Sequence, residues 1–176
     1  MSATDRNPLI LTLRMDAPGQ AFFDRLRDRF FPPERNFLKA HLTLFHQLPN
    51  RPETRELLSG LFMEQFEMTV SSLRHLGAGV AYAIESAELH QLHRFCSLYF
   101  AADLIPQDRQ RFRPHITIEN KVSPEASRHL LTILNNTFAP FIVQAIGLDL
   151  WEYLGGPWQH RFGHNFKVCH DKLDMS

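Results

Sequence analysis

The sequence predicts an α+β protein whose sheets are mostly antiparallel and carry helices on their outer faces. Three observations support this fold class. Segments with strand-like and helix-like spacing of apolar residues alternate along the chain, two strand pairs are joined by short glycine-containing connections, and the two halves repeat the same order of elements. A chain of 176 residues forms one domain, or two lobes that share a core.

The first half of the chain shows where its elements end. Apolar residues before Arg14 are spaced as in a strand, and an Ala-Pro-Gly sequence at 17–19 interrupts them. Pro32 and Pro33 end the first helix, because proline lacks the amide hydrogen that a continuing helix needs. The Gly-Ala-Gly connection at 77–79 suits a hairpin. The expected elements are a strand over 8–15, a helix over 20–31, a strand over 37–45, a helix over 53–65, and paired strands over 66–76 and 80–85.

Helix caps mark the second half of the chain. Ser86 precedes apolar residues at helical spacing, and Ser123 precedes Pro124 and Glu125, which suit the first turn of a helix. Residues 103–113 are polar and rich in arginine, which favours a loop. The expected elements are a helix from 86 to about 102, a strand over 114–120, a helix from 123 to about 137, a strand over 141–153 and, after a Gly-Gly-Pro turn, a strand over 161–168.

The composition narrows the classes of partner. With 19 basic and 19 acidic residues, the chain lacks the basic surplus of proteins that bind long duplex nucleic acid, whereas a small or terminal phosphate needs only a few donors. Cys96 and Cys169 have no close spacing, which favours a reducing cytoplasm over a disulfide scaffold or a zinc ribbon. The N-terminal apolar run is too short for a signal sequence or a membrane span. We therefore expect a cytoplasmic monomer that does not contact membranes.

One four-residue pattern occurs twice, in AHLTLF and in PHITIE: histidine, aliphatic, threonine, aliphatic. In a strand, residues i and i+2 lie on one face about 6.5–7 Å apart. His41 and Thr43 would therefore share a polar face, and His115 and Thr117 would do the same, with the aliphatic residues turned inward. If the two strands pair across a cleft, two imidazoles and two hydroxyls converge on one space.

Two imidazoles in one cleft favour acid–base chemistry. Histidine titrates near pH 6.5, so one ring can be neutral and act as base while the other is protonated and acts as acid. Each proton transfer contributes about 10²–10⁴-fold in rate, and no metal or other cofactor is required. A cation stands two residues before each histidine, Lys39 in the first motif and Arg113 in the second, and would add phosphate-binding groups if both strands extend that far.

These motifs resemble those of the 2H phosphoesterase superfamily, and within it the 2′-5′ RNA ligase-like (LigT-type) proteins. The stretches HLTLF at 41–45 and FRPHITI at 112–118 carry the resemblance, and the element order extends it over about residues 8–168. The resemblance implies a single domain over residues 1–176 with two pseudo-symmetric lobes, each of which contributes one His-x-Thr strand to a central groove.

The resemblance also implies a chemistry and its residues. It implies metal-free cleavage of 2′,3′-cyclic phosphates or 2′-5′ phosphodiesters at RNA ends or in small nucleotides, or the reverse ligation. His41 and His115 would be the acid–base pair, without an assignment of which is the base. Thr43 and Thr117 would bind the phosphate.

Other histidines offer a possible metal site. His90 with His93, and His160 with His164, have helical ligand spacing, but no further ligands complete a metal site near them. We therefore expect no metal.

Aromatic residues could stack on a nucleobase, although packing is the more ordinary role. Phe45 falls on the face of the first motif histidine, Trp151 and Tyr153 share one face of a late strand, and Trp158 follows the turn. By the same alternation, His46 falls on the opposite face unless a β-bulge intervenes, and it is left out of the expected site.

Three functional classes fit the sequence. The first is the phosphodiesterase that the repeated motif and the resemblance favour. A non-catalytic nucleotide- or RNA-binding module would keep the cleft without turnover, and a metal-dependent hydrolase would use the additional histidines.

Overall fold

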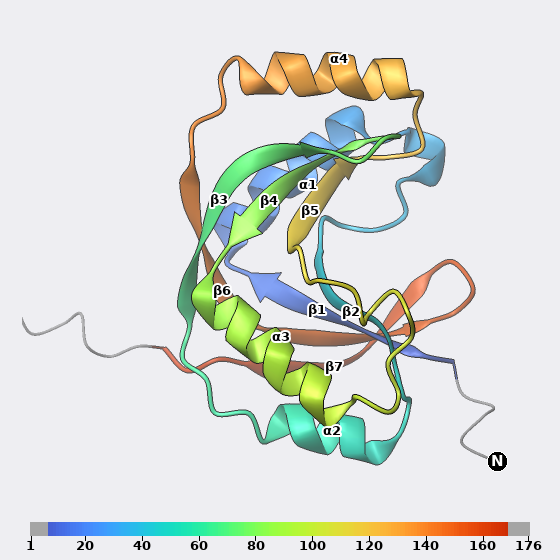
Figure 1. Cartoon of the computed structure of the whole chain (residues 1–176), viewed down its shortest axis with the longest axis vertical. Helices are drawn as coiled ribbons and strands as arrows, with labels where there is room; N and C mark the ends of the chain where they lie inside the picture. The colour runs from blue at the N-terminus through green and yellow to red at the C-terminus, as the bar shows by residue number, and fades with distance from the viewer. Residues whose placement is uncertain (1–6, 169–176) are drawn as a thin grey trace, which may run out of the picture.

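The strands and helices follow one another in the order that the sequence predicts. The computed structural model describes residues 7–168, and over this range it contains seven strands, four α-helices and one short 3₁₀ helix (Figure 1). The elements are β1 (Leu9–Met15), α1 (Ala17–Phe30), η2 (Pro33–Arg35), β2 (Leu42–Leu48), α2 (Pro52–Ser59), β3 (Phe66–His75), β4 (Val80–Glu85), α3 (Ala87–Tyr99), β5 (His115–Glu119), α4 (Pro124–Asn135), β6 (Phe141–Tyr153) and β7 (Trp158–Asn165).

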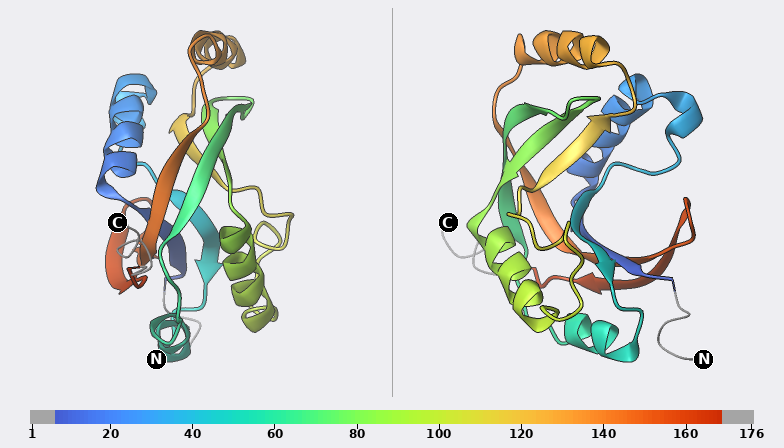
Figure 2. Two further views of the ribbon diagram at one scale, coloured as in Figure 1. Left: turned by 90° about the vertical axis from the view of Figure 1, so that its left-hand side faces the viewer. Right: turned by 45° about the vertical axis from the view of Figure 1, so that its right-hand side comes forward.

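All seven strands belong to one antiparallel sheet in the order β2-β1-β6-β3-β4-β5, with β7 added to β6. The long strand β6 joins its two halves. Residues 141–145 of β6 pair with β3, and residues 145–152 pair with β1. The two lobes are therefore continuous through β6, which runs along one side of the molecule (Figures 1 and 2).

Side-chain caps begin the helices at the predicted positions. The Ser86 side chain accepts a hydrogen bond from the Leu89 amide at the start of α3. Ser123 accepts one from the Ala126 amide at the start of α4, and Pro124 occupies the first turn. Both cap predictions are confirmed.

Two boundaries differ from the sequence prediction because the chain pairs with itself there. The helix expected over 53–65 ends at Ser59, and the residues after it turn toward the C-terminal segment, where the Gln65 amide donates to the Lys167 carbonyl at 2.8 Å. The last strand covers Trp158–Asn165 instead of 161–168, because a tight hairpin turn with Gly155 at φ 87° returns the chain to β6 at once.

The strand with the first histidine motif begins later than expected, at Leu42 instead of residue 37. Side chains of α1 bind the backbone just before it. Asp24 accepts a hydrogen bond from the Ala40 amide at 2.8 Å, and Gln20 donates one to the Ala40 carbonyl at 2.8 Å. His41 therefore stands at the entrance of β2, after a segment that α1 holds in place.

Apolar residues on the inward faces of the motif strands anchor the site. Leu42 and Leu44 in β2, and Ile116 and Ile118 in β5, are at most 3% exposed. The helix α1 packs against β5 and β6, and α4 packs against β3 and β4. The aliphatic residues of both motifs are therefore buried, as the strand alternation predicts.

Two remaining expectations concern cysteines and membranes. Cys96 is buried and unpaired, and burial raises the pKa of its thiol to about 12, whereas Cys169 lies outside the described residues. Within residues 7–168, no helix combines the length and the apolar character that a membrane crossing requires.

Candidate active site

A cleft of about 560 Å³ receives both copies of the repeated motif. His41 and Thr43 come to it from β2 and its entrance, and His115 and Thr117 come from β5. The remaining lining residues come from β2, β3, α3, the 103–113 loop and the start of β7: Leu44, His46, Arg74, His93, Gln107, Asp108, Gln110, Arg111, Phe112, Arg113 and Trp158.

The two motif histidines are oriented in the same way. Nδ1 of His41 lies 2.8 Å from the carbonyl oxygen of Lys39, and Nδ1 of His115 lies 2.8 Å from the carbonyl oxygen of Arg113. A carbonyl oxygen can only accept, so in each neutral ring Nδ1 carries the hydrogen and Nε2 keeps its lone pair. The repeated sequence therefore produces a repeated tautomer, with Nε2 as the basic atom of both rings.

The cleft favours the neutral form of both rings in the free protein. Burial lowers the pKa of His41 to about 4 against the opposing effect of the Lys39 carbonyl, and the charge of Arg27 contributes. Burial also lowers the pKa of His115, and the charge of Arg74 adds to this. An anion bound between the rings would act in the opposite direction and favour protonation of one of them.

A buried arginine fixes the relative position of the two motifs. Arg27 of α1 is 5% exposed, and its Nε donates to the carbonyl of Leu38 at 2.9 Å. Its Nη1 donates to the carbonyl of Thr117 at 3.2 Å. One side chain thus binds both the segment before His41 and the strand that carries the second motif.

Arg74 is a cleft residue that the sequence analysis missed. In the sheet register Arg74 is opposite Ala81, and Ala81 is opposite Thr117, so all three share a face. The neighbouring row places Ala83 opposite His115. One small residue, Ala81, thus separates Arg74 from Thr117 of the motif strand, and Arg74 lines the cleft. The short 77–79 hairpin connection favours the pairing of Arg74 with Ala81, and that was the signal in the sequence, whereas nothing local signals the pairing of Ala81 with Thr117.

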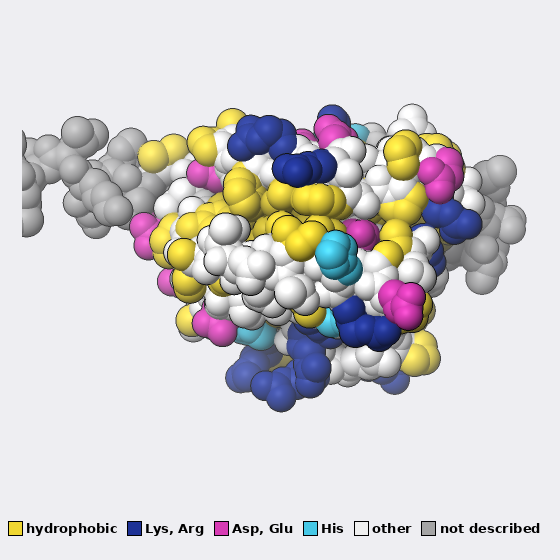
Figure 3. Space-filling view, turned by 90° about the horizontal axis from the view of Figure 1, so that it is seen from above, with side chains coloured by type: hydrophobic (Ala, Val, Ile, Leu, Met, Phe, Trp, Pro, Cys, Tyr) yellow, Lys and Arg dark blue, Asp and Glu magenta, His cyan; other side chains and the backbone are white. Residues whose placement is uncertain are grey.

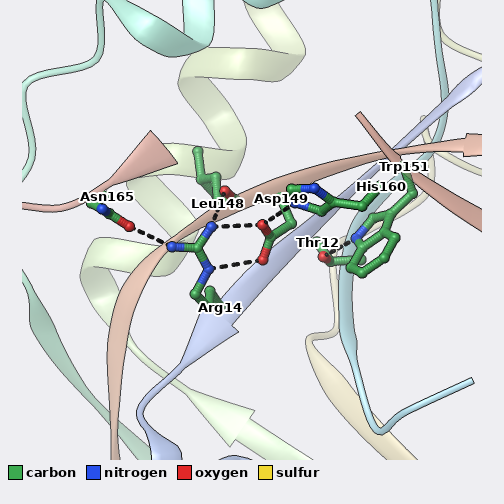
Figure 4. Close-up of polar contacts among 7 residues, drawn as sticks. All are labelled: Thr12, Arg14, Leu148, Asp149, Trp151, His160 and Asn165. Atoms are coloured by element: carbon green, nitrogen blue, oxygen red, sulfur yellow. Dashed lines mark hydrogen bonds and ion pairs between the residues drawn. The ribbon is translucent and has the colours of Figure 1, made fainter. Parts of the chain in front are cut away.

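In the first lobe, Asp149 occupies the place that Arg74 has in the second lobe, and it neutralises a nearby arginine. Thr12 is opposite both Thr43 and Asp149, so Arg14, two residues along β1, lies on their face of the sheet. Arg14 forms a bidentate ion pair with Asp149, with Nε–Oδ2 at 3.0 Å and Nη2–Oδ1 at 2.6 Å, and His160 Nε2 also contacts Asp149 at 2.7 Å (Figure 4). These contacts hold the pKa of Asp149 below its usual range, although burial opposes them.

A β-bulge in β2 corrects the prediction for two residues. Thr12 is opposite Thr43, but Leu11 is opposite Phe45, so β2 contains one additional residue there. A bulge reverses the alternation beyond it. Phe45 accordingly turns into the core, is 0% exposed and stacks on His93 at 4.6 Å, so it presents no face to a ligand. His46 turns into the cleft instead.

A model of the 2′-5′ RNA ligase superfamily matches residues 15–157. The chain belongs to this superfamily. Escherichia coli LigT complexed with 3′-AMP has the same fold, with a TM-score of 0.60 and 17% identity over 93% of this chain and 99% of that chain. The protein TT0787 of Thermus thermophilus matches with a TM-score of 0.63 and 15% identity over 93% and 100% of the two chains. The comparison with curated proteins found no match.

In this superfamily member, the 103–113 loop forms one side of the cleft. Phe112 stacks on His93 with ring centroids 3.9 Å apart, and Arg111 and Arg113 are exposed and line the cleft. Figure 3 shows Lys and Arg side chains gathered at one edge of the molecule beside histidines, although the whole chain carries no net charge. Lys39 is exposed but is not among the lining residues, because β2 begins only after it and the strand alternation does not apply there.

The remaining aromatic candidates lie at different distances from the motif. Trp158 lines the cleft, and its ring centroid is 4.8 Å from that of His41. Trp151 instead donates from Nε1 to Thr12 Oγ1 at 2.9 Å (Figure 4), and Tyr153 is 39% exposed at the end of β6. Of these three aromatic residues, Trp158 is the one whose ring lies beside a motif histidine.

The histidine pairs considered as metal ligands have other partners. His93 lies between two phenylalanine rings, and His90 contacts Phe112. His160 contacts Asp149, and His164 Nε2 contacts the Leu61 carbonyl at 2.9 Å. Among residues 7–168, no group of three or more His, Cys, Asp or Glu is arranged to hold a metal ion.

Proposed function

We propose that the protein is a metal-independent phosphodiesterase that acts on the 2′,3′-cyclic phosphate or 2′-5′ phosphodiester of RNA ends or small nucleotides, and that can run the reverse ligation. One observation carries the proposal: two histidines with the same Nδ1–carbonyl bond face one cleft, each two residues before a threonine. Membership of the 2′-5′ RNA ligase superfamily supports it. We further propose that the protein is cytoplasmic and monomeric and does not bind long duplex nucleic acid.

The proposed reaction uses the two rings in turn. The phosphate lies between them, and the hydroxyls of Thr43 and Thr117 donate to its non-bridging oxygens. One Nε2 takes a proton from water as its oxygen bonds to phosphorus. The opposite phosphorus–oxygen bond breaks, and the other ring, protonated at Nε2, gives its proton to the leaving ribose oxygen. In the reverse direction the two rings exchange roles: the ribose hydroxyl gives its proton to one Nε2 as its oxygen bonds to phosphorus, and the opposite phosphorus–oxygen bond breaks as the other ring protonates the departing oxygen, which leaves as water.

The proposed substrate class follows from the size and charge of the cleft. A small nucleotide needs only a few cationic donors, and the lining supplies Arg74, Arg111 and Arg113. Trp158 stands beside His41, where a nucleobase could stack on it. Structures of E. coli LigT complexed with 3′-AMP, NADP⁺ and ATP show that a protein of the same fold takes nucleotides.

A turnover assay tests the proposal. Nucleoside 2′,3′-cyclic phosphates and 2′-5′-linked oligonucleotides are incubated with the protein, with and without EDTA. We expect turnover that survives EDTA and falls at least about 10²-fold in His41→Ala and in His115→Ala. His129→Ala, an exposed histidine of α4, is the matched control and should retain activity.

Other outcomes of the assay would replace the proposal. Loss of turnover on chelation would indicate a metal-dependent hydrolase. Nucleotide binding without turnover would indicate a binding module. Such a module needs no protonated histidine, so the neutral rings of His41 and His115 would be enough for it.

A further inference from the structure

His46 and Asp108 form a histidine–carboxylate pair at the edge of the cleft. Nδ1 of His46 lies 2.8 Å from Oδ1 of Asp108. The same carboxylate accepts hydrogen bonds at 3.0 Å from the backbone amides of His46 and Gln47. Although burial opposes them, these bonds hold the pKa of Asp108 below its usual range, so it is an ionised acceptor and Nδ1 of His46 is the donor.

The two members of the pair differ in their access to a ligand. The Asp108 side chain is 2% exposed, whereas the His46 side chain is 47% exposed and lines the cleft. Among residues 7–168, Nε2 of His46 has no hydrogen-bond partner. Asp108 therefore orients the ring from behind, and the free nitrogen is available in the space that His41 and His115 share.

The charges of the cleft exceed what one phosphodiester requires. A phosphodiester carries a single negative charge, but the lining contains three arginines, in addition to the motif histidines and His46. Its one carboxylate, Asp108, is buried and already bonded. The charge of His46 also lowers the pKa of both His41 and His115, which places it in the same electrostatic environment.

We propose that His46, oriented by Asp108, binds a second phosphate of the substrate, distinct from the phosphodiester between His41 and His115. This inference rests on the proposed function, because it assumes that a phosphodiester occupies the central position. It makes the preferred substrate a nucleotide that carries a further phosphate, and it makes His46 a residue that determines specificity. In the phosphate-bound state the ring carries a proton on each nitrogen. Nδ1 donates to Asp108, whose negative charge balances that of the ring, and Nε2 donates to a phosphate oxygen.

The substitution His46→Asn separates this role from a purely structural one. The asparagine side-chain nitrogen stands near the position of Nδ1 and can still donate to Asp108, but nothing replaces Nε2. The probes are adenosine 2′,3′-cyclic phosphate with and without a 5′-phosphate. The wild-type protein should prefer the 5′-phosphorylated probe in kcat/KM, and His46→Asn should reduce this preference about 10-fold or more, the usual effect of a lost charge-assisted hydrogen bond. The Tm should stay near that of the wild type.

Two further variants complete the experiment. Asp108→Asn should reduce the preference too, with a lower Tm, because it also disrupts the bonds to the β2 amides. His129→Asn on the surface of α4 should change neither quantity. An unchanged preference in His46→Asn, or equal wild-type kcat/KM for the two probes, overturns the role of His46 and leaves the proposed function intact. Absence of wild-type turnover on both probes overturns the inference, and absence of turnover on the 2′-5′-linked oligonucleotides as well overturns the proposed function.

Discussion

Arg74 and Arg14 both lie on the motif face of the sheet, one in each half, but they have different surroundings. Arg14 is neutralised by the bidentate carboxylate of Asp149. The ion pairs and side-chain hydrogen bonds found among residues 7–168 do not include the Arg74 guanidinium, which lines the cleft with only Ala81 between it and the motif strand. A cation in a cleft without a counter-charge is suited to an anionic ligand, so Arg74 is better placed than Lys39 to bind the phosphate.

This difference leads to a prediction for Arg74→Met. If Arg74 donates to the phosphate, its loss should lower kcat/KM on a 2′,3′-cyclic nucleotide about 10–100-fold and weaken inhibition by inorganic phosphate, because hydrogen bonds to charged groups contribute about 1.5–3 kcal/mol. Arg74→Lys should restore part of the loss. Arg128→Met, which removes the same charge from an exposed position on α4 of the same lobe, is the control. Equal phosphate inhibition of Arg74→Met and wild type would refute the assignment.

Single residues were predictable from the sequence only up to the first irregularity of a strand. The alternation of side chains along a strand correctly predicted a shared cleft for His41, Thr43, His115 and Thr117, because this alternation depends on strand geometry alone. It failed for Phe45 and His46, because one additional residue in β2 exchanges the two faces. A bulge depends on how the neighbouring strand pairs, which local sequence does not determine.

At the scale of elements, α1 does more than cover the sheet. Its Arg27 connects the segment before β2 to β5, while Asp24 and Gln20 bind the backbone of Ala40. These bonds replace the strand pairing that was expected for residues 37–41. Element order was predictable because it follows from hydrophobic periodicity, but the start of β2 depends on side chains from a different element.

Substitution of Arg27 should therefore reduce stability and activity together. In Arg27→Met, two partly buried carbonyl groups lose their donor, and we expect the free energy of unfolding to fall by about 2–4 kcal/mol. Arg27→Lys should not compensate, because one ammonium group cannot reach two separated carbonyls. Urea unfolding measures the effect, with Arg25→Met, an exposed arginine of the same helix, as the control. Equal midpoints for the Arg27 and Arg25 variants would contradict the role given to α1.

For the whole molecule, one strand connects the two lobes, so the cleft depends on the integrity of the complete sheet. β6 pairs with β3 at its beginning and with β1 and β7 farther along. The repeat in the sequence predicted two related halves, and the fold confirms an α+β architecture with helices on the sheet. That a single strand would serve both halves could not be predicted, because the length of β6 alone does not reveal which strands it pairs with.

Burying histidines in a shared cleft should also make the stability of the whole fold depend on pH. Burial lowers the pKa of His41 and that of His93 to about 4, while an unfolded chain has histidine pKa values near 6.5. As the pH falls from about 6.5 toward 4, the unfolded chain binds protons that the folded chain does not, so stability is lost over this window. Glu119 acts in the opposite direction, because burial raises its pKa.

Urea unfolding in phosphate-free buffer between pH 7.5 and 4.5 measures this dependence. We expect the free energy of unfolding to fall with pH, with a contribution on the order of 1–2 kcal/mol from each of the two histidines after allowance for partial solvent screening. His41→Asn should flatten the dependence, and His129→Asn, which alters an exposed side chain, should leave it unchanged. If His41→Asn and wild type lose stability equally over this range, the ring of His41 is not held neutral by the fold. Added phosphate should restore stability at pH 5 in the wild type more than in His41→Asn, because an anion in the cleft favours the protonated ring that burial alone disfavours.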